Sequence, residues 1–178
     1  MVLNFWKIDS KKPTPLLVHI HGGGWLGGKK NETTSPNQMR NGYSYASIDY
    51  RLAGTELLPA AVHDAARAIQ FLRTKAEEWN IDPKRIAVTG GSAGAASSMW
   101  LAYHDDLADP KSKDPVLRQS SRVCGAIAMG GANHSRSVSV RKKDWSRLHP
   151  SSDDLENRGS RKSQASHEGL EQVQGPFA

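Results

Sequence analysis

The sequence predicts an α/β fold in which helices flank a mostly parallel sheet. Short apolar runs rich in branched residues alternate with segments whose apolar residues recur at helical spacing. Parallel strands need long crossover connections, which helices provide. The 178 residues suffice for one good core, but complete domains of this class usually need about 200–250 residues. We therefore expect one incomplete α/β domain.

The expected elements follow one another as strands and helices in turn. Strands are expected over residues 3–8, 16–20, 43–49, 86–89 and 123–129. The first of them suits a sheet edge because its side chains alternate. Helices are expected over residues 59–79 and 94–107. Asp82-Pro83 suits a capped turn before the strand that begins at Ile86.

One pentapeptide has the pattern of a catalytic nucleophile. Gly90-Gly91-Ser92-Ala93-Gly94 fits G-x-S-x-G and lies between an expected strand and an alanine-rich helix. Glycines are needed there because the turn strains the backbone and brings strand and helix close together. Ser92 is therefore the candidate nucleophile. The alternative is a serine in a tight glycine turn of some other α/β protein.

A glycine loop upstream supplies a second part of the same chemistry. The expected second strand leads into His21-Gly22-Gly23-Gly24-Trp25. Backbone N–H groups of such a loop can bind the oxyanion that forms when a nucleophile attacks a carbonyl. We expect the N–H groups of Gly23, Gly24 and Ala93 to form this oxyanion hole, with an ordinary glycine-rich loop as the alternative. Trp25 either lines an acyl pocket or packs.

The two motifs in this order resemble those of the α/β-hydrolase carboxylesterases, close to the hormone-sensitive-lipase-like and the feruloyl and acetylxylan esterase groups. Four connecting segments are also similar to that family: residues 49–53, 59–64, 80–83 and 125–131. The resemblance implies an α/β-hydrolase fold, cut short after the strand that follows the nucleophile helix. It further implies a serine hydrolase of short-chain or acetyl carboxylic esters, with a small-molecule ester as its partner and no cofactor.

The resemblance does not extend to the acid and the histidine that act with the serine. In the family the acid and the histidine follow the serine, in the last third of the domain. Four histidines come after Ser92: His104, His134, His149 and His167. His104 is expected about three helical turns from Ser92, beyond its reach, and the other three have no family context. We assign neither acid nor base and expect poor ester hydrolysis, with a non-catalytic esterase remnant as the rival interpretation.

Residues 133–178 differ in character from those before them. Nine of these 46 residues are serines and only ten are hydrophobic, which is too few to offset the entropy of ordering. Permitted codons for residues 133–138, read one nucleotide later, can yield Thr-Thr-Leu-Asp-Pro-Phe, which resembles the family at that point. We expect a partial α/β-hydrolase domain over residues 1–132 and a disordered or out-of-frame tail over residues 133–178.

A competing motif lies in the same glycine loop. Residues 23–29 satisfy G-x-x-x-x-G-K, the pattern of a phosphate-binding loop. Such a loop needs Ser or Thr next, for magnesium, and then a helix whose N-terminus faces the phosphates. Lys30 takes that position and the residues after it favour turns. A nucleotide-binding protein is therefore a much weaker alternative.

Two pairs of polar residues have structural interpretations. His19 and His21 share one strand face, but two ligands without a third are a weak signal, so no metal site is expected. We expect His21 to orient the glycine loop and His19 to pack. Arg51 and Asp64 are expected to form a buried ion pair between a strand end and the following helix.

Composition narrows the partners and the location. The net charge is +6, but the basic residues are scattered, which favours a solvated surface over nucleic-acid binding. No run is long enough for a membrane span and no export signal is present. We expect no membrane partner. The cytoplasm is the expected location by default, or secretion if a segment precedes Met1.

Cys124 lies in an apolar run and is expected in the core. The oligomeric state is not indicated.

Overall fold

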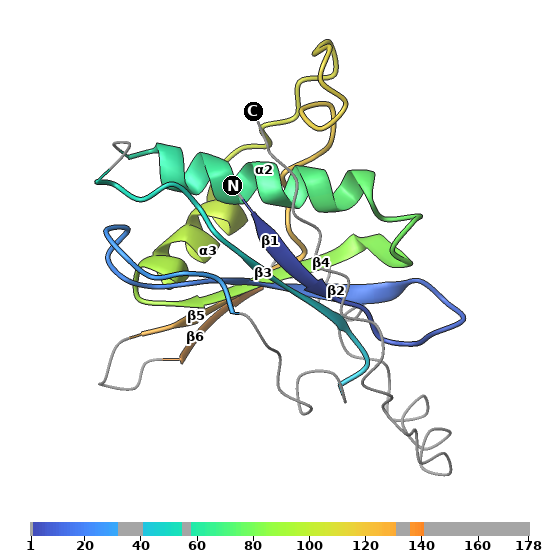
Figure 1. Ribbon diagram of the computed structural model, residues 1–178, viewed down its shortest axis with the longest axis horizontal. Coiled ribbons are helices and arrows are strands. Elements are labelled where there is room, and N and C mark those ends of the chain that lie inside the picture. Colours follow the sequence, from blue (N-terminus) through green and yellow to red (C-terminus); the bar gives the residue numbers. More distant parts are fainter. Residues whose placement is uncertain (1, 32–40, 55–57, 131–135, 141–178) are drawn as a thin grey trace.

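The computed structural model describes residues 2–31, 41–54, 58–130 and 136–140. Its strands form one six-stranded sheet in the order β1-β3-β2-β4-β5-β6 (Figure 1). The strands are β1 (Leu3–Trp6), β2 (Thr14–Ile20), β3 (Ser44–Ile48), β4 (Ile81–Gly91), β5 (Gly125–Met129) and β6 (Arg136–Val140). The helices among the described residues are α2 (Ala60–Thr74) and α3 (Ala93–Tyr103).

Strand pairing is parallel at the centre of the sheet and antiparallel at both edges. β3, β2, β4 and β5 pair in parallel, while β1 and β6 join the two edges in the opposite direction. α2 lies between β3 and β4 in the chain, and α3 between β4 and β5. This is the crossover arrangement that parallel pairs require. The predicted α/β fold with a mostly parallel sheet is confirmed.

Both helices lie on the same side of the sheet (Figure 1), and the strand side chains that face them form the core. On β2 these are Leu16, Val18 and Ile20, each at most 1% exposed. Leu17 and His19 alternate with them and are only half-buried, as the two-residue period of a strand requires. The carboxyl ends of β2 and β4, where the two motifs begin, are paired neighbours in the sheet.

The helices are shorter than their apolar patterns suggest. α2 ends at Thr74 rather than at residue 79, and α3 ends at Tyr103 rather than at residue 107. Trp79 is nevertheless buried, because its ring stacks on Phe5 with centroids 4.6 Å apart. The apolar period thus continues into a loop that packs on the sheet. Neither described helix is long and apolar enough to cross a membrane.

β4 begins earlier than expected, at Ile81. Asp82 still makes the turn-like contacts that its sequence suggests, since its carboxylate accepts the Lys84 N–H at 2.9 Å and the Arg85 Nε–H at 2.7 Å. The register between β4 and β2 shifts nearby, between Thr14 and Leu16. The expected capped turn is therefore an irregular first half of the strand.

β6 is a strand that we did not expect from the sequence, because it lies within residues 133–178. Residues 136–140 pair antiparallel with β5, from Gly125 opposite Val140 to Met129 opposite Arg136. Serine and valine alternate there, a strand pattern too short to stand out in a serine-rich stretch. β6 satisfies a sheet edge that would otherwise present unpaired backbone groups. The rest of 133–178 lies outside the described residues, so the boundary at 132 and the nature of the tail stay predictions.

Candidate active site

Ser92 occupies a strained turn between β4 and α3. Its φ is 53° and its ψ is −120°, a conformation that non-glycine residues rarely adopt. Its backbone N–H donates to the carbonyl of Met129 at 3.1 Å, and its carbonyl accepts the N–H of Ala96 at 3.0 Å. Ser92 is exposed, while Ala93 behind it is buried. The turn therefore holds the serine at the surface, at the carboxyl edge of the sheet.

The glycines on either side of Ser92 are required by close backbone contacts. A Cβ atom on Gly90 would lie 2.4 Å from the carbonyl oxygen of Ile20, and one on Gly94 would lie 2.0 Å from the same oxygen. Either contact is far below van der Waals distance. The end of β2 thus packs directly against the turn, so the serine and the glycine loop that follows β2 are held together.

The glycine loop turns back beside the serine. Gly23 and Gly24 have φ values of 106° and 63°, which favour glycine. The carbonyl of Gly23 accepts the N–H groups of Leu26 at 3.0 Å and Gly27 at 3.1 Å, which closes a tight turn. A Cβ atom on Gly22 would lie 3.6 Å from the Cβ of Ser92. The loop therefore contacts the nucleophile turn.

The expected oxyanion donors have unused N–H groups within the described part of the chain. No hydrogen bond there is donated by the N–H groups of Gly23, Gly24 or Ala93. Ala93 is also the first residue of α3, where N–H groups have no partner inside the helix and the helix dipole is positive. These are the properties that an anion site needs. Their role as an oxyanion hole stays a prediction.

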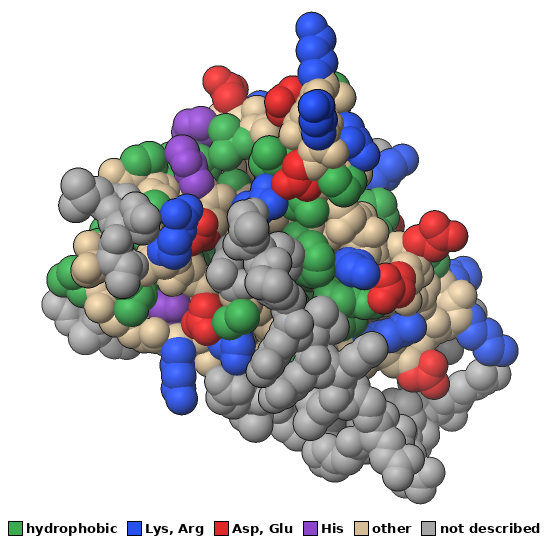
Figure 2. Space-filling view, turned by 45° about the horizontal axis from the view of Figure 1, so that its top comes forward, with side chains coloured by type: hydrophobic (Ala, Val, Ile, Leu, Met, Phe, Trp, Pro, Cys, Tyr) green, Lys and Arg blue, Asp and Glu red, His purple; other side chains and the backbone are tan. Residues whose placement is uncertain are grey.

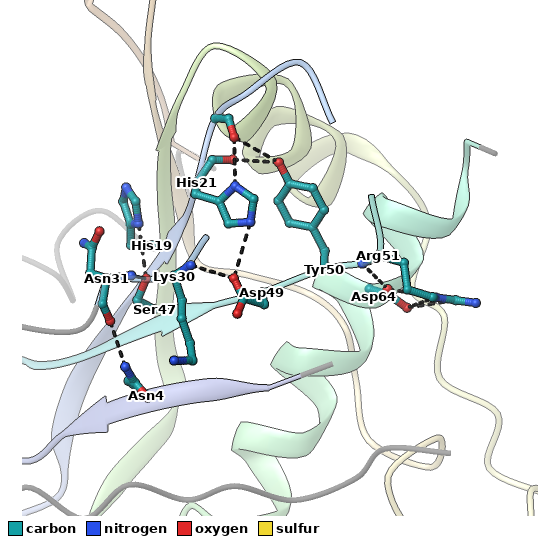
Figure 3. A network of polar contacts seen from close by, with 11 residues as sticks. Asn4, His19, His21, Lys30, Asn31, Ser47, Asp49, Tyr50, Arg51 and Asp64 are labelled. Carbon is teal, nitrogen blue, oxygen red and sulfur yellow. Dashed lines mark hydrogen bonds and ion pairs between the residues drawn. The ribbon is translucent and has the colours of Figure 1, made fainter. Parts of the chain in front are cut away.

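His21 supports the glycine loop from below (Figure 3). Its Nδ1–H donates to the carbonyl of Gly22 at 2.8 Å. Its ring stacks on Tyr50 with centroids 4.1 Å apart, and the Tyr50 hydroxyl donates to the carbonyl of His21 at 3.0 Å. Nε2 of His21 is buried without a hydrogen bond and lies 3.6 Å from Oδ1 of Asp49. The expectation that His21 orients the loop is confirmed by these contacts.

The far end of the loop is fixed to β3 through its backbone. The Lys30 N–H donates to Oδ1 of Asp49 at 2.5 Å, and the Asn31 N–H donates to Oγ of Ser47 at 2.8 Å (Figure 3). Asn31 also accepts a hydrogen bond from Nδ2 of Asn4 at 2.8 Å through its carbonyl. These anchors were not expected from the sequence, although the polar Ser47 and Asp49 alternating at the end of an apolar strand were the available signal.

The residues after the glycines do not have the structure of a phosphate-binding loop. Such a loop leads directly into a helix, whereas residues 29–31 form neither helix nor strand. The backbone N–H of Lys30 is instead occupied by a carboxylate. The geometry of the described loop therefore favours an oxyanion hole over a phosphate-binding loop.

Trp25 joins the glycine loop to the nucleophile helix. Its indole Nε1–H donates to Oγ of Ser97 on α3 at 3.1 Å. Its carbonyl accepts the N–H of Ala53 at 2.6 Å, and its side chain packs against the core. Of the two roles left open for Trp25, these contacts favour packing. The hydrogen bond to Ser97 was not suggested by the sequence.

The described histidines each contact groups other than Ser92. His19 lies 3.4 Å from Oγ of Ser47, and burial, with a smaller effect of His21, lowers the pKa of His19. His104 contacts the Asp105 carbonyl at the end of α3. Within the described ranges no three His, Cys, Asp or Glu side chains gather as a metal site. The remaining candidates, His134, His149 and His167, lie outside the described residues, so acid and base stay unassigned.

The expected ion pair between Arg51 and Asp64 is present. Asp64 on α2 accepts the Arg51 N–H at 2.8 Å, Nε–H at 3.0 Å and NH2 group at 2.9 Å (Figure 3). The Asp64 side chain is 9% exposed, but that of Arg51 is 49% exposed. The pair is therefore half-buried rather than buried. It fixes the segment after β3 to α2.

Comparisons with known proteins agree with this geometry. The BD-FAE family model matches residues 5–131. An arylesterase of Saccharolobus solfataricus is 40% identical over 98 residues, which are 52% of this chain and 32% of that protein. Carboxylesterase NlhH of Mycobacterium tuberculosis is 36% identical over 101 residues, 55% of this chain and 32% of that protein. The chain spans about a third of the length of these curated relatives.

Solved structures show the same fold. The acetyl ester-xyloside bifunctional hydrolase from Caldicellulosiruptor lactoaceticus superposes with a TM-score of 0.64 at 32% identity, covering 71% of this chain and 47% of that one. Thermogutta terrifontis esterase 2 phosphorylated by paraoxon gives a TM-score of 0.55 at 29% identity, covering 72% and 51%. The strained serine turn, the glycine loop and these similarities lead to one conclusion: the chain belongs to the BD-FAE family of α/β-hydrolase-fold esterases.

Proposed function

We propose that this chain carries the nucleophile and the oxyanion hole of a carboxylic ester hydrolase. The observation that carries the proposal is the backbone of Ser92, whose positive φ at the junction of β4 and α3 exposes the serine beside the glycine loop. Strained backbone of this kind persists only where surrounding structure enforces it, and it gathers at functional sites. Here the close contacts of Gly90 and Gly94 with Ile20 enforce it.

The reaction that this site supports is acyl transfer. Oγ of Ser92 attacks the ester carbonyl carbon, and the C=O electron pair moves to the oxygen. The N–H groups of Gly23, Gly24 and Ala93 stabilise that oxyanion, aided by the positive end of α3. The carbonyl then re-forms as the alcohol leaves, which gives an acyl-serine that water hydrolyses. The serine proton passes to a base and then to the leaving alcohol.

The substrate class that we propose is a short-chain or acetyl ester. The relatives' names support this choice, since one is an acetyl ester-xyloside hydrolase and another is an esterase with propionate bound. The described residues supply no base, so turnover that relies on them alone should remain about 10³–10⁴-fold above water, the level left when a triad member is absent. A second candidate, a non-catalytic esterase remnant, is favoured by this same lack of a described base.

The test is hydrolysis of p-nitrophenyl acetate by the full chain and by Ser92→Ala. We expect slow turnover that disappears in Ser92→Ala and survives in Ser112→Ala, a serine on the loop between α3 and β5. Turnover without dependence on Ser92 would refute the proposed nucleophile and favour the non-catalytic interpretation. Ser92-dependent turnover at an ordinary esterase rate would refute only the expected impairment, and would mean that a histidine within residues 133–178 acts as the base.

A further inference from the structure

Trp25 has a backbone conformation that a bulky residue seldom adopts. Its φ is 59°, and large side chains with positive φ are outliers that surrounding contacts must maintain. Gly24 next to it has a similar φ of 63°, but a glycine adopts it without strain. Glycine at position 25 would therefore remove the strain. The tryptophan side chain must provide something that offsets this cost.

What the side chain provides is a fixed link to the nucleophile helix. Its Nε1–H donates to Oγ of Ser97 at 3.1 Å, across 72 residues of sequence. Oγ of Ser97 in turn donates to the carbonyl of Ala93 at 3.0 Å, one helical turn back. Ser97 is fully buried, so water does not compete for its hydroxyl.

The directions of both hydrogen bonds are determined by chemistry. An indole N–H can only donate, and a carbonyl oxygen can only accept. The Ser97 hydroxyl therefore gives its proton to Ala93 and offers a lone pair to Trp25. The result is a relay from the glycine loop, through one buried hydroxyl, to the residue that follows the nucleophile.

We propose that Trp25 is a positioning residue that, through Ser97, fixes the Gly23–Gly24 turn relative to the N–H of Ala93. The proposal rests on the proposed function, because it assigns these N–H groups to one oxyanion hole. Two donors lie on the loop and the third lies on α3. Whether all three N–H groups point at one oxyanion therefore depends on how the loop is placed against the helix. The Trp25–Ser97 bond is a direct side-chain hydrogen bond between these two elements.

The precision of this link bears on rate more than on binding. Oxyanion donors must lie about 2.7–3.1 Å from the position of the developing charge, and a displacement of about 1 Å can cost about 10²-fold. Losing this bond leaves the loop anchored by His21 and Asp49 at its two ends and by the Ala53 N–H at the Trp25 carbonyl, but removes its side-chain hydrogen bond to α3. Interactions made in the transition state should weaken, while substrate binding changes little.

The experiment compares Trp25→Phe and Ser97→Ala with a matched control. Phenylalanine keeps an aromatic ring and removes the N–H, and Ser97→Ala removes its acceptor. Ser98→Ala is the control, because Ser98 is equally buried and makes the same type of bond to the Gly94 carbonyl, at 2.8 Å, but has no hydrogen bond to the described glycine loop. Urea unfolding of each variant verifies that it is folded before its Ser92-dependent turnover of p-nitrophenyl acetate is measured.

We expect both test variants to lose about 10-fold or more in kcat with KM changed less than about 2-fold. The double variant should be no slower than the slower single one, because both changes remove one bond. Unchanged kcat in Trp25→Phe and Ser97→Ala, or an equal loss in Ser98→Ala, would overturn the proposal. A wild-type chain without Ser92-dependent turnover would instead refute the proposed function.

A spectroscopic readout tests the link without relying on turnover. The indole N–H resonance of Trp25 in a ¹H–¹⁵N spectrum should shift in Ser97→Ala and stay in place in Ser98→Ala. A Trp25 indole resonance that is unaffected by Ser97→Ala would overturn the relay whatever the activity. The failure of the link and the failure of the esterase assignment are thus separate observations.

Discussion

The rings of His21 and Tyr50 stack with centroids 4.1 Å apart, and the Tyr50 hydroxyl returns to the carbonyl of His21 at 3.0 Å. The same hydroxyl also lies 3.4 Å from the carbonyl of Gly22. Tyr50 follows β3, whereas His21 opens the glycine loop after β2. The stack therefore makes the start of the loop part of the folded core (Figure 3).

Tyr50→Phe should destabilise the chain by about 1 kcal/mol, the usual net contribution of a hydrogen bond. The ring stack remains, but the carbonyl of His21 loses its donor, and that of Gly22 keeps only the Nδ1–H of His21. Urea unfolding at neutral pH measures the change. Tyr43→Phe is the control, since among the described residues its hydroxyl makes only a long, exposed contact of 3.4 Å with Asn41. Equal effects of the two substitutions would contradict this account.

The contribution of Tyr50 to the free energy of unfolding should change with pH in the alkaline range. Burial, and then the negative charge of Asp49, raise the pKa of Tyr50 above its usual value of 10.0. A raised pKa in the folded state means that the stabilisation is fully present below pH 10.0 and is lost as pH rises through the folded-state pKa. The difference in unfolding free energy between wild type and Tyr50→Phe should therefore shrink above pH 10.0. A difference that grows there would contradict the direction of the shift.

Alanine at Gly90 or Gly94 should destabilise the chain by about 3 kcal/mol, the upper end of the usual cost of overpacking. In each case the new methyl group would collide with the carbonyl of Ile20. Gly54→Ala is the control, because a Cβ there meets nothing within 4 Å. Thermal unfolding of the three variants provides the comparison. Wild-type stability in Gly94→Ala would show that β2 does not pack on the serine turn as described.

Gln70 should prove important for the loop between α3 and β5. It is 1% exposed, and its Nε2 donates to the carbonyls of Gln119 at 2.8 Å and Leu107 at 3.3 Å. Gln70→Leu should cost about 2 kcal/mol, because half-buried carbonyls lose their donor. Protease cleavage within residues 104–122 should also accelerate. Gln119→Ala keeps the backbone acceptor and should stay within about 0.5 kcal/mol of wild type; a comparable loss there would contradict this reading.

Local patterns predicted most of the fold because they report on burial. The alternation in β2 and the helical period in α2 follow from which side chains face the core. Both motifs could be placed because parallel strands end at the same edge of a sheet, which brings Ser92 and the glycine loop together. Patterns predicted the ends of elements poorly, since Trp79 is buried by tertiary packing after its helix has ended.

Contacts between distant side chains could not be predicted in the same way. Nothing near Trp25 in the sequence indicates that its indole meets Ser97. The polar Ser47 and Asp49 at the end of β3 indicate a polar anchor, but not that Asp49 binds the Lys30 N–H. Both contacts arise from the way the glycine loop lies against α3 and the end of β3. Charge was the exception, because Arg51 and Asp64 could be paired from their opposite signs and their places at a strand end and a helix start.

We propose that Ser92 is a nucleophile held beside an oxyanion hole, and covalent labelling is the sharpest test of this role. In paraoxon, attack by Oγ of Ser92 forms a P–O bond and expels p-nitrophenolate, and one related esterase is phosphorylated by this compound. Mass spectrometry of the digested full chain should find one diethyl phosphoryl group, on Ser92, and none in Ser92→Ala. An unlabelled wild type, or equal labelling of wild type and Ser92→Ala at another residue, would contradict the claim.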